Sequence, residues 1–196
     1  MQDSSTGLRE RQRTETLHRL HDAAVELVRE DGMTAATVSA IADRAGVSRR
    51  TFFNYYATKE DAVLGAGPAH VPDGAIDGLL DGDDRLGDAV RLVIRVVRTI
   101  RHTPTDRVAL RKLRRANPEL RERTQQHTIH AYQLLADALA ERYEGAQADS
   151  AIALILIAVS AVRFAYRHDP DIFDNPDSPA VSSAVTIFRE IIKDLQ

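Results

Sequence analysis

Residues 37–59 read TVSAIADRAGVSRRTFFNYYATK, and their spacing is that of a helix-turn-helix leading into a further helix. The apolar residues Val38, Ile41, Ala42 and Ala45 recur at helical spacing, so they predict one buried helix face. Residues typical of helix ends flank this face, because a hydroxyl satisfies a free backbone N–H and glycine adopts the left-handed conformation easily. They are Thr37 before the first helix, Gly46 after it, Val47 at the corner and Ser48 before the second helix. The segment therefore predicts two short helices joined by a tight corner.

The second helix, predicted over residues 49–56, has two different faces. Phe52 and Tyr56 lie four residues apart and are expected to face the core. The remaining side chains are expected to project outward: Arg49, Arg50, Thr51, Phe53 and Tyr55. Arginine matches the O6 and N7 atoms of guanine, and a good bidentate pair gives ~1–3 kcal/mol of discrimination. The outward face therefore predicts contact with base edges in the major groove of DNA.

These residues resemble the TetR family of bacterial regulators, whose motif reads roughly T-x-x-x-I-A-x-x-A-G-V-S-x-x-T-x-Y-x-H/Y-F-x-x-K-E-x-L. Eleven positions match it: Thr37, Ile41, Ala42, Ala45, Gly46, Val47, Ser48, Thr51, Tyr55, Lys59 and Glu60. Residues 13–31, followed by Gly32, are similar to the first helix of that family. The resemblance extends over residues 14–64, and beyond them it rests on helical architecture alone.

Two positions depart from the motif of the family. Phe53 stands where a tyrosine is usual, so a phosphate contact through that hydroxyl is absent. Tyr56 replaces a core phenylalanine, and its hydroxyl needs a partner or a route to solvent.

The resemblance implies double-stranded DNA as a partner and assigns a role to each matching side chain. Arg49, Arg50 and Thr51 are expected to contact bases, and Phe53 to contact a thymine methyl group. The residues expected to hold phosphates or to start the helices beside them are Thr37, Ser39, Ser48, Tyr55 and Lys59. Arg9, Arg11 and Arg13 precede the motif and would either follow the DNA backbone or remain a solvated arm.

The composition is that of a soluble globular protein. The chain has 196 residues, 43% of them hydrophobic, and a formal net charge of −3. It has no cysteine, which excludes disulfides, thiolate zinc sites and cysteine redox sensors. Its first residues are polar, and the longest apolar run, residues 151–162, is shorter than the ~20 residues of a membrane helix. We therefore expect a cytoplasmic protein with no membrane partner.

Helical signals continue to the end of the chain, so the fold class predicted is all-α. Residues 1–65 are expected to form an N-terminal arm, a three-helix DNA-binding domain and the start of a connecting helix, with residues 1–8 as a disordered tail. Residues 66–196 are expected to form a helical bundle for ligand binding and dimerisation, after a joint rich in Gly, Pro and Asp at residues 65–82. The helices predicted in it cover residues 84–102, 106–115, 118–143, 148–167 and 179–195.

The last two helices predict a homodimer. The helix at 148–167 is apolar on nearly every side, so it needs cover from two directions, and the helix at 179–195 carries one continuous apolar stripe. The residues expected at the interface are Ile155, Val159, Val162, Val185, Phe188 and Ile192. The alternative is that both helices are simply core. A dimer would space two recognition helices by about one DNA turn, ~34 Å, and read a palindromic operator.

The middle helices are expected to enclose a small-molecule effector. Arg91, Arg95 and Arg98 lie on one helical face, which is either a solvated face or the mouth of a site for an anionic effector. The pocket residues expected are Arg95, Val96, Ile100, His127, His130, Arg163, Phe164 and Tyr166. Two histidines without a third ligand do not predict a metal site, and no cofactor is expected.

The function predicted is a ligand-responsive transcriptional regulator, with a repressor favoured over an activator. No G-x-S-x-G, phosphate-binding glycine loop, H-E-x-x-H or Cys/His zinc spacing is present, so an enzyme is not expected. A helical interaction module that does not read DNA is the alternative from another class, and it would make Arg49 and Arg50 dispensable.

Overall fold

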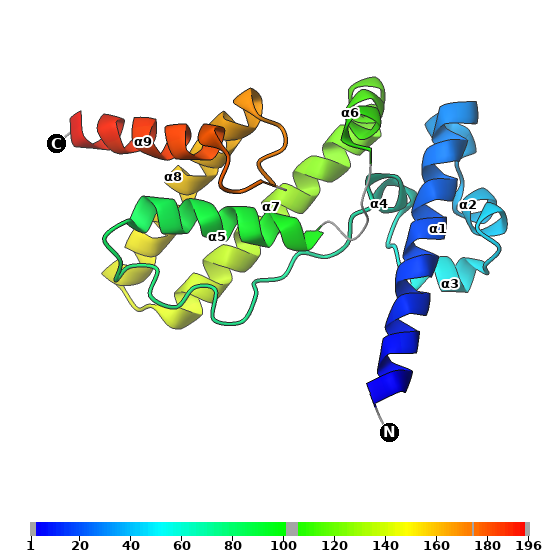
Figure 1. Ribbon diagram of the computed structural model, residues 1–196, viewed down its shortest axis with the longest axis horizontal. Coiled ribbons are helices and arrows are strands. Elements are labelled where there is room, and N and C mark those ends of the chain that lie inside the picture. The colour runs from blue at the N-terminus through cyan, green and yellow to red at the C-terminus, as the bar shows by residue number, and fades with distance from the viewer. Residues whose placement is uncertain (1–2, 101–105, 174, 195–196) are drawn as a thin grey trace. The chain divides into compact units, whose positions relative to one another are not determined.

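The computed structural model describes residues 3–100, 106–173 and 175–194, with only the backbone path of residues 3–10 and 107. Within these ranges the regular structure is nine helices and no strand, which confirms the all-α class (Figure 1). The helices are α1 Asp3–Ala35, α2 Val38–Arg44, α3 Arg49–Phe53, α4 Lys59–Leu64, α5 Arg85–Ile100, α6 Arg107–Ala116, α7 Pro118–Arg142, α8 Ala146–His168 and α9 Pro179–Asp194.

The first helix is longer than predicted. It begins at Asp3, so the expectation of a disordered tail over residues 1–8 was wrong for the described residues 3–8. The polar residues there include no proline, and nothing in them prevents the backbone hydrogen bonding of a helix. Gly32 does interrupt the helix where an end was predicted, because it takes φ 82° and ψ 171°, and the helical path resumes up to Ala35.

The C-terminal helices confirm the predicted elements. The described ends of α5 to α9 lie within two residues of the ends expected from the sequence. The recognition helix α3 is shorter than the predicted 49–56, because regular helix ends at Phe53. Tyr55 and Tyr56 nevertheless continue the turn, since their amides donate to the carbonyl oxygen of Phe52 at 2.9 and 3.0 Å.

Packing groups the chain into two compact units. The first comprises residues 1–68 and 100–127, and the second comprises residues 69–99 and 128–196. The helix α7 therefore contributes its residues up to His127 to the first unit and those from Thr128 to the second. The division at residue 65 expected from the sequence remains a prediction about folding domains.

The core of the first unit is built from α1 to α4 with one residue of α7. Leu20, Ile41, Phe52 and Leu120 are each fully buried there. Tyr56 is 2% exposed, and its hydroxyl donates to the carbonyl oxygen of Leu17 at 3.3 Å. The hydroxyl that replaces the usual phenylalanine ring edge is therefore hydrogen-bonded within the core. This core fixes the positions from which the outward residues of α3 project.

The helix α8 supplies much of the core of the second unit. It has 23 residues and reaches a mean hydropathy of 1.9, so by length and composition alone it is apolar enough to cross a membrane. Core helices of soluble proteins pass the same test, and seven of its residues are buried within the unit. These are Ala151, Ile155, Ala158, Val159, Ala161, Val162 and Ala165.

Candidate nucleic-acid interface

The corner between α2 and α3 is set by glycine geometry and by two hydroxyl caps. Gly46 has φ 68°, a left-handed conformation that side chains other than glycine adopt at a cost. The Thr37 side chain accepts a hydrogen bond from the amide of Ala40 at 3.2 Å, and the Ser48 hydroxyl accepts one from the amide of Thr51 at 3.0 Å. The predicted caps of α2 and α3 are therefore confirmed, and the turn holds α3 in one orientation.

The outward face of α3 is open and positively charged. Arg49 and Arg50 are exposed, and Phe53 is 53% exposed, which is unusual for a large aromatic ring. No ion pair or hydrogen bond joins either arginine side chain to another residue within the described part of the chain. As far as the described residues go, the donors of the two guanidinium groups are available for an external acceptor.

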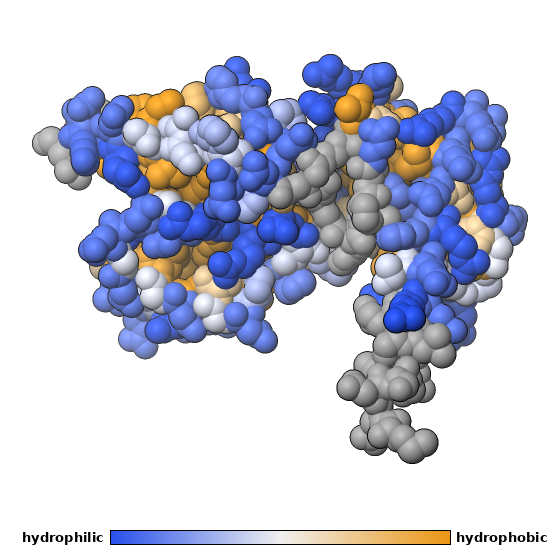
Figure 2. Space-filling view, in the orientation of Figure 1, coloured by the Kyte–Doolittle hydropathy of each residue, from blue (hydrophilic) through white to orange (hydrophobic). Residues whose placement is uncertain are grey.

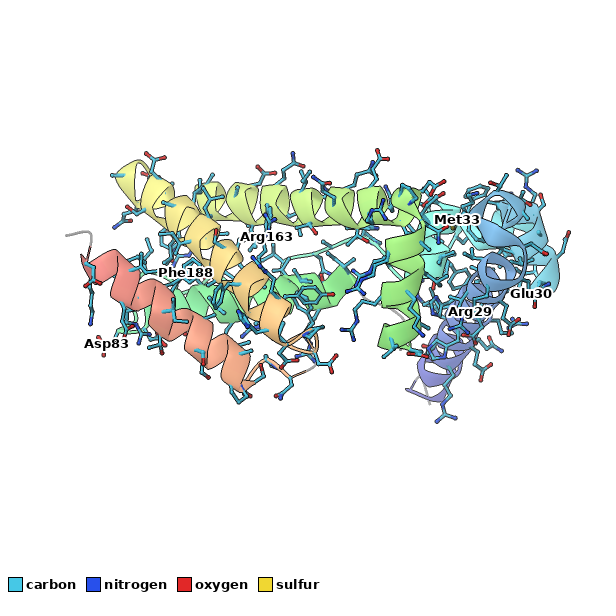
Figure 3. The ribbon with its side chains drawn as sticks, turned by 90° about the horizontal axis from the view of Figure 1, so that it is seen from above. Arg29, Glu30, Met33, Asp83, Arg163 and Phe188 are labelled. Carbon is cyan, nitrogen blue, oxygen red and sulfur yellow. The ribbon has the colours of Figure 1, made fainter. Side chains whose placement is uncertain are left out.

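Arg44, on the neighbouring helix α2, is in a different situation. Its guanidinium lies 2.7 Å from a carboxylate oxygen of Glu30 and 3.9 Å from one of Glu26. Glu30 and Met33 lie near the C-terminal end of α1 (Figure 3). The charge of Arg44 is therefore balanced by Glu30 and Glu26 within the unit.

The residues expected to hold phosphates differ in their burial and in their contacts within the chain. Ser39 and Tyr55 are half-buried at the edge of the motif, with the guanidinium of Arg13 5.8 Å from the centre of the Tyr55 ring. Lys59 donates from its ammonium to the carbonyl oxygen of Met33 at 2.5 Å, so it also closes the end of α1. The side chain of Arg9 lies outside the described residues.

The helix α4 follows the motif and is joined to both α1 and α7. Nδ1 of His21 lies 2.7 Å from the carbonyl oxygen of Ala62, and because a carbonyl only accepts, Nδ1 carries the proton. On the other side the carboxylate of Asp61, only 3% exposed, accepts from Nε and Nη2 of Arg123, each at 2.7 Å. It also accepts from Nε2 of His127 at 2.6 Å.

Burial and hydrogen bonding shift the pKa of Asp61 and of His21. Burial alone would raise the pKa of Asp61, but the hydrogen bonds from His127 and Arg123 outweigh it and lower the pKa to about 2. Burial lowers the pKa of His21, although its bond to Ala62 opposes that effect. Asp61 is therefore charged and His21 neutral at neutral pH.

The residues expected to form the effector pocket are not gathered in one described cavity. Val96 and Ile100 are buried, whereas Arg95, His130 and Arg163 are exposed. His127 belongs to the first unit, where its Nε2 donates to the carboxylate of Asp61 at 2.6 Å, whereas His130 belongs to the second unit. Tyr166 stacks on Phe173 with 5.6 Å between ring centres. Among the described residues, no group of three or more metal-ligating side chains is present.

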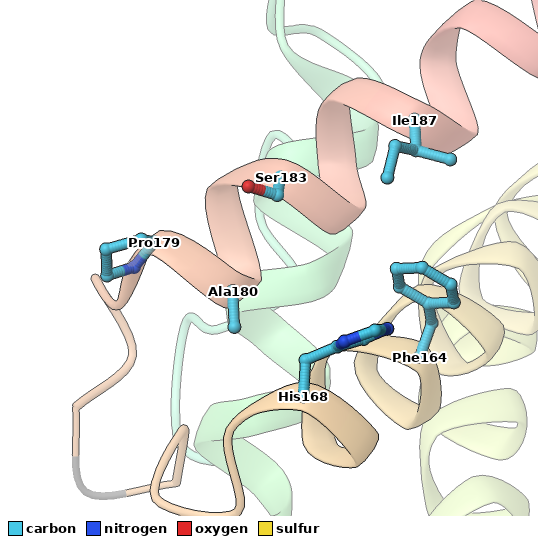
Figure 4. A pocket seen from close by; sticks show the side chains of 6 residues that line it. All are labelled: Phe164, His168, Pro179, Ala180, Ser183 and Ile187. Atoms are coloured by element: carbon cyan, nitrogen blue, oxygen red, sulfur yellow. The ribbon is translucent and has the colours of Figure 1, made fainter.

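A groove lies on the second unit between α8 and α9. Its volume is about 290 Å³, and Figure 4 shows Phe164 and His168 of α8 facing Ala180, Ser183 and Ile187 of α9. Pro179 completes the lining. The rings of Phe164 and His168 lie 4.7 Å apart, and Phe164 is the one predicted pocket residue that lines this groove.

The residues expected at the dimer interface are mostly buried by their own chain. Ile155, Val159, Val162 and Val185 are each at most 9% exposed, so a second chain could bury little more of them. Phe188 and Ile192 are half-buried. The large apolar side chains that α8 and α9 leave open are Leu156, Ile187 and Ile191, at 59%, 37% and 51% exposure. The apolar face turned outward is therefore offset from the one predicted, and Figure 2 shows apolar side chains at the surface over these helices.

Two comparisons with known proteins bear on this site. The family model described as bacterial regulatory proteins, tetR family, matches residues 20–64, which include the helix-turn-helix and α4. A protein of Mycobacterium tuberculosis (strain ATCC 25618 / H37Rv), provisionally named mycofactocin biosynthesis transcriptional regulator MftR, is 33% identical over 148 residues. That match covers 71% of this chain and 71% of the relative.

The sequence, the corner geometry and the two matches agree with one another. The exposed Arg49 and Arg50 belong to α3, which lies within residues 20–64, the segment that the family model matches. The similarity to the relative extends well beyond that motif. The chain belongs to the TetR family of bacterial regulatory proteins and is a transcriptional regulator with a helix-turn-helix for binding DNA.

Proposed function

We propose that the protein is a homodimeric repressor that binds a palindromic operator and is released from it by a small-molecule effector. The observation that carries the DNA-reading part is the pair of exposed arginines on α3 without partners among the described residues. Arg49 and Arg50 contact bases, Thr51 assists them, and Phe53 packs on a thymine methyl group. Thr37, Ser39, Tyr55 and Lys59 hold the phosphates on either side.

Exposed apolar surface on α8 and α9 supports the dimer. Leu156, Ile187 and Ile191 are large apolar residues on adjacent helices, and a soluble chain gains by covering them. The groove beside Phe164 lies on the same pair of helices and would receive side chains from the second copy. Because a two-fold axis repeats the same surface on both partners, α8 and α9 of two chains would form a four-helix interface.

The effector is expected to bind within the second unit. Arg163 lies close enough to Tyr132 to oppose the rise in the tyrosine pKa that burial causes, so a cation and a half-buried hydroxyl share one region. Such a pair suits an anionic ligand, whereas Arg91 is already paired with Asp88 at 2.7 Å. Ligand binding would favour a conformer with the wrong spacing of the recognition helices, in proportion to its differential affinity for the two states.

Genomic-fragment selection with purified protein at moderate salt, followed by footprinting, tests the proposal. A protected palindrome is expected, with the two half-sites about one DNA turn apart. No enrichment by protein that is folded, dimeric and stripped of ligand would contradict the DNA-reading function and favour an interaction module. An operator that overlaps a promoter supports repression, and one upstream of it supports activation.

The named role of the relative supplies one candidate set of target genes. We infer that fragments beside genes for mycofactocin biosynthesis are worth including as defined probes in the same selection. Tight, salt-resistant binding to such a fragment would extend the role of the relative to this chain. Enrichment of unrelated fragments instead would assign this chain a different set of genes.

A further inference from the structure

The helix α4 is held by side chains from two directions within the first unit. His21 of α1 donates to the carbonyl oxygen of Ala62 in α4 at 2.7 Å. Lys59 of α4 donates in turn to the carbonyl oxygen of Met33 in α1. From α7, Arg123 and His127 donate three hydrogen bonds of 2.6 to 2.7 Å to the carboxylate of Asp61. These two sets of contacts meet on adjacent residues of α4.

The contact with α7 is rigid as well as short. Arg123 presents two parallel N–H groups to the two oxygens of Asp61, a geometry that fixes both distance and direction. The remaining arm of its guanidinium donates to the side-chain oxygen of Gln126 at 3.0 Å. His127 fills the other approach to the same carboxylate, so Asp61 cannot turn without losing a bond.

We propose that Asp61, Arg123 and His127 form a positioning cluster that fixes α4, and through it the recognition helix α3, in the orientation that binds the operator. This inference rests on the proposed function, since it concerns how that same DNA-binding surface is held. Only four residues separate Asn54, the C-cap of α3, from Lys59, the first residue of α4. A displacement of α4 is therefore passed directly to α3.

Removal of both charges of the cluster together should cost little stability, although removal of one alone leaves a buried charge without its partner. A buried ion pair gives up most of its Coulombic gain to desolvation, so its replacement by uncharged groups is often neutral for folding. What is lost on replacement is the directional bond. This separates a positioning role from a merely structural one, because the first alters DNA binding in a protein that remains folded.

The test compares five variants of the full-length chain, one of which is Asp61→Asn alone. Arg123→Met breaks the bidentate pair, and Asp61→Asn with Arg123→Met removes both charges, which protects folding. Arg123→Lys keeps the positive charge but loses the two parallel N–H groups of the guanidinium. The matched control is Arg189→Met, which breaks an ion pair of 2.6 Å with Asp84, both partners being 44% exposed and outside the first unit.

The first readout is amide hydrogen exchange of residues 49–64, which needs neither operator nor effector. Exchange across α3 and α4 should become faster in Arg123→Met and in the double variant and stay at the wild-type rate in Arg189→Met. The exchange rate in Arg123→Lys should lie between that of the wild type and that of Arg123→Met. Unchanged exchange in the double variant, with the chain folded, would overturn the proposal.

The second readout is operator affinity at a temperature where every variant is folded. Loss of the cluster should weaken binding by about five- to 150-fold, the usual range of coupling between sites. The effects of Asp61→Asn and Arg123→Met should not add, because both remove the same contact. Faster exchange with undiminished operator affinity would refute the link to DNA binding. If the wild type selects no operator, the proposed function fails, and the exchange result alone decides whether the cluster fixes α3 and α4.

Discussion

Arg49 and Arg50 differ from five other arginines of this chain in what surrounds them. Arg44, Arg91, Arg123, Arg142 and Arg189 each meet a carboxylate within 4 Å, whereas the two arginines of α3 meet none among the described residues. Both their exposure and their place after a hydroxyl cap could be predicted from the sequence. That Arg44 would be paired could not, since its partners lie on another helix.

Arg50→Ala should lower affinity for the operator by about 1–3 kcal/mol and relax base preference at one or two positions, because a bidentate base contact is lost. Arg85→Ala, which removes another exposed arginine at the start of α5, is the control and should leave both unchanged. Quantitative binding to a library of single-base operator variants measures the two effects. A uniform loss over all sequences would instead indicate that Arg50 holds a phosphate.

Asp61 should make folding sensitive to acid. Its pKa in the folded chain is about 2, against an ordinary value of 3.8, so the charged form is favoured by folding. The contribution, on the order of 2 kcal/mol, is complete above pH ~4 and is lost as the pH falls toward 2. Urea unfolding of wild type and Asp61→Asn, at one protein concentration and several pH values, measures it.

The stability difference between those two proteins should shrink over that same pH window. Subtracting the variant from the wild type removes the contribution of the other carboxylates, which titrate in both. A difference that stays constant from pH 7 to pH 2 would show that the charge of Asp61 contributes nothing to folding.

At the scale of helices, local chemistry accounts for most of what could be predicted. Thr37, Ser48 and Thr58 each accept the hydrogen bond expected of a cap, and Gly46 and Gly65 follow helices in the left-handed conformation. The Asp61 cluster could not be predicted, because its partners lie 62 and 66 residues away. An acid three residues after a cap is ordinarily read as part of a helix start.

Gly46→Ala should destabilise the chain by about 1–2 kcal/mol, because the left-handed backbone brings Cβ close to the following carbonyl oxygen. No other atom lies within 4 Å of the position that a Cβ would take, so the cost arises from the backbone alone. Gly46→Asn should cost less, since asparagine tolerates this conformation. Thermal unfolding of the three proteins tests the order, and equal losses for alanine and asparagine would contradict it.

At the scale of the whole molecule, the order of the helices could be predicted from Gly and Pro residues and from apolar spacing. The face of α8 that is exposed could not be predicted in this way. Ile155, Val159 and Val162 were expected at an interface and are core residues, while Leu156 is exposed. A helix apolar on nearly every side gives no periodic signal to tell its two faces apart. The pocket residues were equally hard to place, because burial by distant helices decides which side chains meet.

Leu156→Asp and Ile191→Asp should each convert the proposed dimer to a monomer, because association would bury an unpaired carboxylate. Val108→Asp is the control, since Val108 is 56% exposed but belongs to α6 of the first unit, which is not part of the proposed interface. Light scattering during size-exclusion chromatography gives the mass of each. The interface would lie elsewhere if all three variants stayed dimeric, and aspartate would be acting unspecifically if all three dissociated.

The unpaired arginines of α3 sit on a chain whose net charge is −3, and this combination affects how the protein finds its target. DNA repels the molecule as a whole and attracts it through one small face, so encounters in other orientations separate quickly. At physiological salt the electrostatic attraction between α3 and DNA acts only within ~8 Å, so it orients the protein only at the end of its approach. We expect a search made of brief hops through solution, with little time spent sliding along unrelated DNA.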